Sequence, residues 1–345
     1  MSGTTGTLAV VGQTGRSLSF FDLSTGERTA QLNDLIAEPH ELCFDRRRNL
    51  LYISHTYRHG HYWVHDDYAH EISVVDCTTK TVVDTIDVFP TQGPHGLILD
   101  EEKDILYACV EELVVGQGGG VIGIDLKSKS IIKKVESQSK PHWFVITPDG
   151  RKAYTCNKSQ PFISVLDLEK ENFSGKLEVS ASEELGVSLD GKFVFVPTPG
   201  LTIGPPPADA SIKVVDTTLD EIIKSIPTGL GPQVVRMTSS GRMMVAKYSY
   251  GASADGGVAS AQSGRLALYS PDTHEFLGEA AVGKGPLTIR SSPEGETAFV
   301  ANIFDGTVTV INLTSMTVVQ TLSIDDKPTS ANTKHPSAHG LAMIV

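Results

Sequence analysis

The sequence of 345 residues lacks the features that mark a membrane-spanning or nucleic-acid-binding protein. No apolar run approaches the ~18 residues of a membrane-spanning helix. The net charge is −12, and no basic cluster occurs beyond Arg46-Arg47-Arg48. We therefore expect neither a nucleic acid nor a membrane as a partner. The first residues show no basic segment followed by an apolar one, so we also expect no secretory leader.

Cysteine is scarce, and the four present form no CxxC pair. They are Cys43, Cys77, Cys109 and Cys156. We expect small buried thiols in a reducing compartment, which favours a cytoplasmic protein. The absence of a CxxCH motif argues against haem as a cofactor. The glycine-rich stretches at 116–120 and 251–257 lack the following helix of a phosphate-binding loop, so no nucleotide cofactor is expected either.

Residues 140–180 contain four short runs rich in β-branched and aromatic residues, separated by Gly, Pro, Asp and Asn. The runs are WFVI, KAYTC, FISVLDL and KLEVS, and the turn signal TPDG separates the first two. Such runs predict strands joined by tight turns. Four of them make one antiparallel sheet of the size of a propeller blade.

The same pattern recurs along the chain with a constant internal spacing. His142 stands twelve residues before Tyr154. The same interval links His40 with Tyr52, His95 with Tyr107, Glu183 with Phe195, Gln233 with Val245, and Leu287 with Phe299. We call the first residue of each pair, together with His339, the marker residues. Seven markers predict an all-β, seven-bladed β-propeller of four-stranded antiparallel blades, as a single domain over 1–345. Three N-terminal strands within 7–32 and one C-terminal strand from residue 339 would close the last blade.

The long connections all follow the second strand of a predicted blade. They occupy 55–70, 110–120, 198–210 and 248–264, whereas the turns after the first and third strands are short. In an up-and-down blade, these connections share a face with the links that lead to the markers. A rigid scaffold with long loops on one face usually carries its function there, so we expect ligands on that face.

The marker residues are rich in side chains that titrate or bind metals. They include four histidines and one glutamate: His40, His95, His142, His339 and Glu183. Because equivalent positions of a closed ring face its axis, we expect these five at the mouth of the central channel. They are candidates for catalytic acid–base groups near neutral pH, and the four histidines are also candidate ligands of a divalent metal ion such as Zn, Fe, Mn or Ni. A third interpretation is structural, with each ring hydrogen-bonded to a neighbouring blade.

The repeats resemble the YVTN-type propeller repeat over nearly the whole chain. The resemblance rests on GPHGLILD, KPHWFVITPDGRKAYTCN and GPLTIRSSPEGETAFVAN, in which YTCN (154–157) is close to the tetrapeptide that names the repeat. Related seven-bladed propellers include lactone-forming and lactone-opening enzymes, streptogramin lyases and quinoprotein dehydrogenase subunits. The streptogramin lyases are similar in placing histidine chemistry and a divalent ion at the channel mouth. The resemblance implies the fold and leaves the reaction open.

The insertion at 55–70 concentrates histidines and aromatic residues. We expect an aromatic lid whose rings wall an apolar pocket and whose histidines supply polar contacts. The alternatives are a solvated loop, or a separate metal site on His59 and His61, which share one face of an extended strand. The predicted substrate-binding residues here and at other blade ends are His55, Tyr57, His59, His61, Trp63, Trp143, Asn157, Gln233 and Tyr248.

Three functions follow from these observations. The first is an enzyme acting on a small organic molecule by acid–base or metal-assisted chemistry, as a lyase, an isomerase or cyclase, or a lactone hydrolase. The second is a noncatalytic scaffold that binds a protein or peptide on the long-loop face. The third is a redox subunit, which the missing haem motif disfavours. Titratable and aromatic residues gathered at one small mouth favour the enzyme, because protein-binding faces are typically broader, apolar and rich in Arg. The oligomeric state stays open.

Overall fold

The computed structural model of the protein describes residues 4–61, 64–65, 67–157, 160–180, 182–199, 210–249, 251–252, 258–259, 263–270, 272–324 and 337–345. Within these ranges the chain forms strands and turns, arranged as seven four-stranded antiparallel sheets and two two-stranded ones. The predicted all-β class and the seven four-stranded blades are confirmed. No helix in the described ranges is long and apolar enough to cross a membrane.

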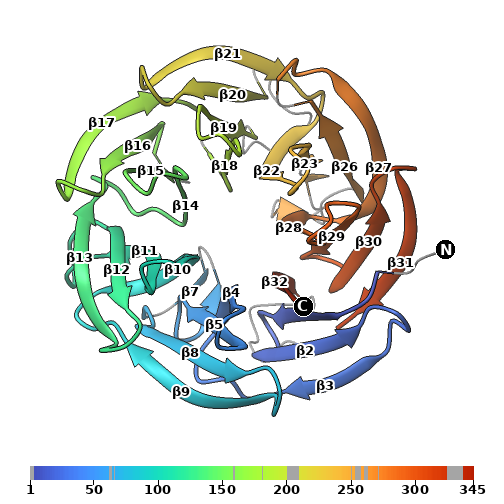
Figure 1. Ribbon diagram of the computed structural model, residues 1–345, viewed down its shortest axis with the longest axis horizontal. Coiled ribbons are helices and arrows are strands. Elements are labelled where there is room, and N and C mark those ends of the chain that lie inside the picture. Colours follow the sequence, from blue (N-terminus) through green and yellow to red (C-terminus); the bar gives the residue numbers. More distant parts are fainter. Residues whose placement is uncertain are drawn as a thin grey trace. The chain divides into compact units, whose positions relative to one another are not determined.

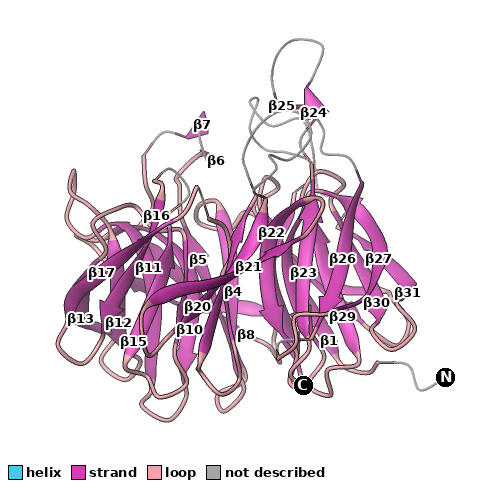
Figure 2. Ribbon diagram, turned by 90° about the horizontal axis from the view of Figure 1, so that it is seen from above, coloured by secondary structure: helices cyan, strands magenta, loops and turns pink. Residues whose placement is uncertain are grey.

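The chain divides into two compact units, of which the first comprises 1–142 and 322–345 and carries three blades (Figure 1). In hydrogen-bonding order, one blade consists of β3 (Arg28–Leu32), β2 (Ser17–Asp22), β1 (Thr7–Gly12) and β32 (Ala338–Ile344). The next blade consists of β4 (Pro39–Asp45), β5 (Leu50–His55), β8 (Glu71–Asp76) and β9 (Thr81–Asp87). The third consists of β10 (Gln92–Asp100), β11 (Ile105–Glu112), β12 (Gly120–Asp125) and β13 (Ser130–Glu136). A short hairpin of β6 (Gly60–His61) and β7 (Val64–His65) extends beyond the ends of β5 and β8 (Figure 2).

The second unit, residues 143–321, carries four blades. They are β14 (Trp143–Ile146), β15 (Lys152–Cys156), β16 (Phe162–Asp167) and β17 (Asn172–Glu178); β18 (Gly186–Val187), β19 (Phe193–Thr198), β20 (Ser211–Asp216) and β21 (Glu221–Pro227); β22 (Gly231–Met237), β23 (Met243–Tyr248), β26 (Ser263–Tyr269) and β27 (Phe276–Lys284); and β28 (Pro286–Ser291), β29 (Thr297–Asn302), β30 (Thr307–Asn312) and β31 (Thr317–Ser323). A two-stranded hairpin, β24 (Gly251–Ala252) and β25 (Val258–Ala259), follows β23. That the two units form one domain stays a prediction.

One blade of the first unit is built from both ends of the described chain. β32 pairs antiparallel with β1, with Thr7 opposite Ile344 and Val10 opposite Leu341. Figure 1 shows the two strands side by side, and β2 and β3 complete the sheet. The predicted combination of three N-terminal strands with one C-terminal strand is therefore confirmed.

The blade of β4, β5, β8 and β9 is covered on both faces, which explains its strongly apolar middle strands. In β5, Leu51 and Ile53 pack with Phe20 of the preceding blade. Tyr52, on the other face of the same strand, packs with Leu106 of the following blade. Burying one such aliphatic side chain contributes about 1.5–3 kcal/mol before the loss of conformational entropy is counted.

The twelve-residue interval corresponds to a fixed strand register. In five of the six blades with an internal marker, the residue twelve after the marker pairs with the residue three after it, as Tyr52 does with Cys43 and Tyr154 with Val145. In the Gln233 blade, Val245 instead pairs with Val235, two residues after the marker. The sequence interval is constant there, but the pairing is shifted by one residue.

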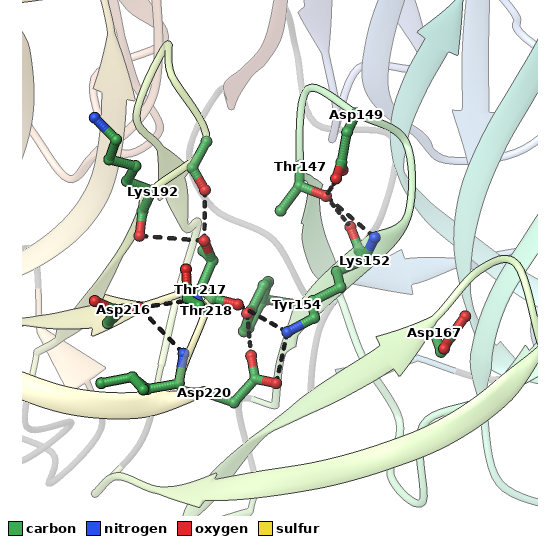
Figure 3. Close-up of polar contacts among 12 residues, drawn as sticks. Thr147, Asp149, Lys152, Tyr154, Asp167, Lys192, Asp216, Thr217, Thr218 and Asp220 are labelled. Carbon is green, nitrogen blue, oxygen red and sulfur yellow. Dashed lines mark hydrogen bonds and ion pairs between the residues drawn. The ribbon is translucent and has the colours of Figure 1, made fainter.

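Short turns tie neighbouring blades of the second unit together (Figure 3). Asp220, in the turn after β20, accepts hydrogen bonds from the Tyr154 hydroxyl and, at 2.7 Å, from Lys152 Nζ of the preceding blade. Lys152 Nζ also donates to the Thr217 carbonyl at 2.7 Å. Burial and the Asp220 carboxylate both raise the pKa of Tyr154. The tyrosine of this repeat therefore holds blades together.

Candidate functional site: a histidine–glutamate cluster

Several marker residues lie at β-bulges in the first strand of their blade. In β4, His40 and Glu41 together stand opposite Ser54 of β5. The same kind of register shift occurs at the markers His95, Gln233, Leu287 and His339. Neighbouring side chains of a regular strand point to opposite faces, but a bulge adds a residue and re-aims them. As a result, Nδ1 of His40 and Oε1 of Glu41 are only 4.0 Å apart.

The four marker histidines of the first unit lie together. The His40 ring sits between two others, with its centroid 4.1 Å from that of His95 and 4.2 Å from that of His339. The His142 ring lies 5.9 Å from His95. His40, His95 and His339 are buried, whereas His142 is partly exposed. The structure thus brings together four of the five predicted ring residues, and the fifth, Glu183, belongs to the second unit.

Glu41 completes a compact group of three side chains that can bind metals. Its Oε1 lies 3.2 Å from Nδ1 of His339, and one ligand atom from each of His40, Glu41 and His339 lies within 4.8 Å of the other two. All three residues are 3% exposed. Two ligands of one tetrahedral zinc ion, with bonds of about 2.0–2.2 Å, lie about 3.3 Å apart. The spacing and the donor types of this group therefore fit a divalent ion.

A second histidine–glutamate pair adjoins the first. Nε2 of His95 lies 3.2 Å from Oε1 of Glu111, which also accepts the Tyr57 hydroxyl at 2.8 Å. The other carboxylate oxygen accepts the Tyr68 hydroxyl at 3.0 Å. Burial raises the pKa of Glu111, but hydrogen bonds from His95, Tyr57 and Tyr68 together outweigh burial and lower the pKa to about 2. Glu111 is therefore ionised at neutral pH.

His95 is neutral at the same pH. Burial lowers its pKa, and the neighbouring Glu111 carboxylate offsets that effect only in part. An ionised carboxylate can only accept hydrogen bonds, so Nε2 of His95 carries the proton and Nδ1 carries the lone pair. An imidazole in this tautomer can accept a proton at Nδ1.

The insertion at 55–70 is fastened to this second pair by aromatic residues. Tyr57 and Tyr68 form an isolated antiparallel bridge, and both donate to Glu111. The His65 ring stacks on Tyr57, with centroids 4.1 Å apart and planes at 14°. Lys140 Nζ lies 5.0 Å from the centre of the Tyr68 ring. Aromatic side chains of this loop thus lie directly beside the histidines.

The remaining predicted residues of the loop differ in outcome. His55 is fully buried, with Nδ1 3.1 Å from the Ala37 carbonyl and Nε2 2.8 Å from Ser73 Oγ. Both nitrogens bind protein atoms, so we omit His55 from the site. His59 is exposed, and His61 lies in β6. Trp63 lies outside the described residues, and a metal site on His59 and His61 stays a prediction.

The other predicted site residues belong to the second unit, and none is more than 4% exposed. They are Trp143, Asn157, Glu183, Gln233 and Tyr248. Asn157 donates from Nδ2 to the Phe162 carbonyl at 2.9 Å and to Ser164 Oγ at 3.2 Å. These bonds link the second and third strands of one blade, so we assign Asn157 a structural role.

The Trp143 ring contacts two arginine side chains of the second unit that share one carboxylate. The guanidinium carbons of Arg236 and Arg290 lie 4.6 and 5.7 Å from the centre of its ring. Both guanidinium groups pair with Oε1 of Glu184. Cation–π contacts contribute roughly 0.5–2 kcal/mol, depending on exposure. Because the four residues come from four blades, we assign Trp143 to the cohesion of this unit.

Curated proteins with detectable similarity are distant. No family model matches the chain. It is 24% identical over 241 residues to the uncharacterized protein YncE of Salmonella typhimurium, a match that covers 68% of this chain and 61% of that protein. It is 25% identical over 219 residues to antigen Lp49 of Leptospira interrogans, covering 59% of this chain and 44% of that protein. The chain thus spans less than two thirds of the length of these relatives.

Solved structures give broader matches. A chain of Kuenenia stuttgartiensis hydrazine synthase matches with a TM-score of 0.66 and 14% identity, over 85% of this chain and 88% of that one. The chain is a seven-bladed β-propeller. A second match to the propeller is the dihydro-heme d1 dehydrogenase NirN in complex with DHE, with a TM-score of 0.58 and 13% identity, over 93% and 64% of the two chains. At such identities the likeness establishes the fold alone.

Three residues of the propeller's cluster, Glu41, Tyr68 and Glu111, are not among the site residues predicted from the sequence. Glu41 had a visible signal, since the residue after the marker is glycine in the His95 and His339 blades but a carboxylate after His40. Tyr68 lies in the loop that the sequence singled out as aromatic. Glu111 had no signal of its own, because its partners come from other strands and are distant in sequence.

Proposed function

We propose that the propeller is an enzyme for a small organic molecule, with a divalent metal ion held by His40, Glu41 and His339. The observation that supports this proposal is the group of three buried donor side chains within 4.8 Å of one another. Two imidazoles and a carboxylate suit Zn²⁺ and related ions, and three protein ligands leave positions for water or substrate.

His95 is the proposed base. Its ring centroid lies 4.1 Å from that of His40, next to the proposed ligands. A bound metal ion supplies Lewis acidity and lowers the pKa of bound water. His95 takes a proton at Nδ1 from water or from substrate, and the carboxylate of Glu111, 3.2 Å from Nε2, stabilises the resulting imidazolium. This arrangement serves a hydrolase, a lyase, or an isomerase or cyclase, and it requires neither nucleotide nor haem.

The metal content of purified protein tests the proposal without knowledge of the substrate. We expect about one divalent ion per chain in the wild type prepared without chelator, and a large loss in Glu41→Gln and His339→Ala. His274→Ala is the control, because His274 is a histidine of the second unit and lies outside the proposed ligand group. Equal metal content in all four folded proteins would refute the assignment of these ligands.

A metal-free version is the second candidate function. It is favoured by the two matching contacts, in which an imidazole nitrogen lies 3.2 Å from a glutamate oxygen in both the His339–Glu41 and the His95–Glu111 pair. In that version both imidazoles act as acid–base groups oriented by carboxylates. The two candidates separate by chelator treatment, which abolishes turnover only in the metal-dependent version.

A further inference from the structure

A cleft of about 670 Å³ lies in the first unit beside the histidine–glutamate cluster. Its lining includes Arg58, Asp67, Tyr68, His70, Phe89 and Val115. The volume falls in the range of about 300–1,000 Å³ that is typical of small-molecule sites. None of these residues is among the three proposed metal ligands, so the cleft adds a separate binding surface.

Exposed apolar side chains form one wall of the cleft. Phe89 is 58% exposed and Val115 is 54% exposed, although large apolar side chains are usually buried. The Phe89 ring lies 5.5 Å from the His70 ring, in an edge-to-face arrangement. Tyr68 is partly buried and also lines the cleft. This wall offers aromatic and aliphatic surface to a ligand.

The charges around the cleft favour a neutral or cationic ligand. Arg58 is ion-paired with Glu71, and Nδ1 of His70 lies 2.8 Å from Oδ1 of Asp87. Lys140, next to Tyr68, is paired with Glu112 at 2.8 Å. The two nearby cations, Arg58 and Lys140, thus each have their own carboxylate. Asp67 is exposed and adds a further negative charge.

The Glu111 side chain connects Tyr68, which lines the cleft, with the proposed base His95. The Tyr68 hydroxyl donates to Oε2 of Glu111 at 3.0 Å, and Oε1 of the same carboxylate lies 3.2 Å from Nε2 of His95. A molecule that contacts Tyr68 in the cleft is therefore two polar contacts away from the base.

We propose that this cleft binds the aromatic part of a neutral or cationic small molecule, such as an aromatic amine, while the reacting part extends to the cluster. The assignment of substrate class rests on the proposed function. Binding in the cleft does not, because it requires no metal and no turnover.

The test uses two probes with the same ring system and opposite charge, tryptamine and indole-3-propionate. Each is titrated into the full-length protein and followed by NMR, before and after chelator treatment. We expect tryptamine to bind more tightly than indole-3-propionate, and we expect Phe89→Ala to weaken tryptamine binding about tenfold through loss of the stacking and cation–π surface. Phe276→Ala is the control, since Phe276 is also an exposed phenylalanine, at 54%, but lies in the second unit.

The outcomes separate the cleft from the metal centre. Equal affinity of the two probes, or an unchanged tryptamine affinity in Phe89→Ala, would overturn the cleft proposal. Tryptamine binding that persists after chelator treatment and depends on Phe89 would support the cleft, whatever metal content the protein shows. In a further variant, Asp67→Asn, the loss of a negative charge is expected to reduce the difference in affinity between tryptamine and indole-3-propionate.

Discussion

Single side chains determine what the histidine cluster can do, and the two glutamates matter most among them. Glu41 lies beside His339 and His40, and Glu111 lies beside His95. A carboxylate next to an imidazole favours the charged ring, whereas burial favours the neutral one. The Glu111 carboxylate makes His95 a stronger base, and burial keeps the ring neutral and able to accept a proton at pH 7.

Replacing Glu111 by Gln tests this balance at His95. The amide keeps a hydrogen-bond acceptor for Nε2–H but removes the negative charge, so the pKa of His95 should fall further below its ordinary value. We expect activity to drop about 10- to 100-fold, as is typical for partners that orient a reactive group. NMR titration of labelled histidine measures the pKa directly, and an unchanged or raised His95 pKa in the folded variant would argue against the assigned pair.

Acid should destabilise the protein through His55. Burial lowers the pKa of this ring to about 4, from 6.5 in an exposed histidine. The unfolded state therefore binds the proton first, and stability of roughly 3 kcal/mol that is present above pH 6.5 is lost as the pH falls towards 4. Denaturant unfolding between pH 7 and pH 4 should show a flatter pH dependence in His55→Asn than in the wild type. Parallel curves for the two proteins would show that another group governs the acid limb.

At the level of secondary structure, the site depends on how closely the first strands of neighbouring blades approach. β32 packs against β4 through Gly340, where an added Cβ would lie 2.6 Å from the His40 carbonyl oxygen. This glycine follows His339 directly, and the bulges beside it re-aim both histidines. Backbone approach and bulges together bring residues of separate strands into one cluster.

Gly340→Ala should therefore force β32 and β4 apart. We expect a loss of roughly 1–3 kcal/mol in the free energy of unfolding, together with weaker metal binding. Gly175→Ala is the control, because a Cβ at Gly175 meets nothing within 4 Å. Thermal and chemical denaturation measure the first effect and metal titration the second. A Gly340→Ala protein as stable and as metal-competent as the control would refute the tight approach.

Removal of residues 339–345 should expose a sheet edge. These residues make up most of β32, which pairs with β1, and without them the backbone of β1 is left as an unpaired edge. We expect a lower melting temperature and concentration-dependent aggregation, detected by light scattering. A truncated protein that stays monomeric with an unchanged melting temperature would contradict the role of β32.

For the whole molecule, the repeat in the sequence was sufficient to predict the blades. The twelve-residue interval sets the first two strands of six blades, and short runs of β-branched and aromatic residues mark the strands. The cluster could be predicted only in part. The marker histidines follow from register, but the participation of Glu41 depends on a bulge, which no hydrophobic periodicity reveals. Glu111 and Tyr68 belong to the cluster through contacts between a strand and a loop. Tyr57 and Glu111 are 54 residues apart in the sequence, and Tyr68 and Glu111 are 43 residues apart. Such contacts exist only after the blades have packed.

The central claim is that His40, Glu41 and His339 hold one divalent metal ion. Its most direct test is anomalous diffraction, at the absorption edge of the metal found by elemental analysis, from crystals grown without chelator. The account predicts one strong peak, about 2.0–2.2 Å from a nitrogen of each histidine and from a Glu41 oxygen. A structure with no peak there, and with His339 Nδ1 hydrogen-bonded directly to Glu41, would contradict it.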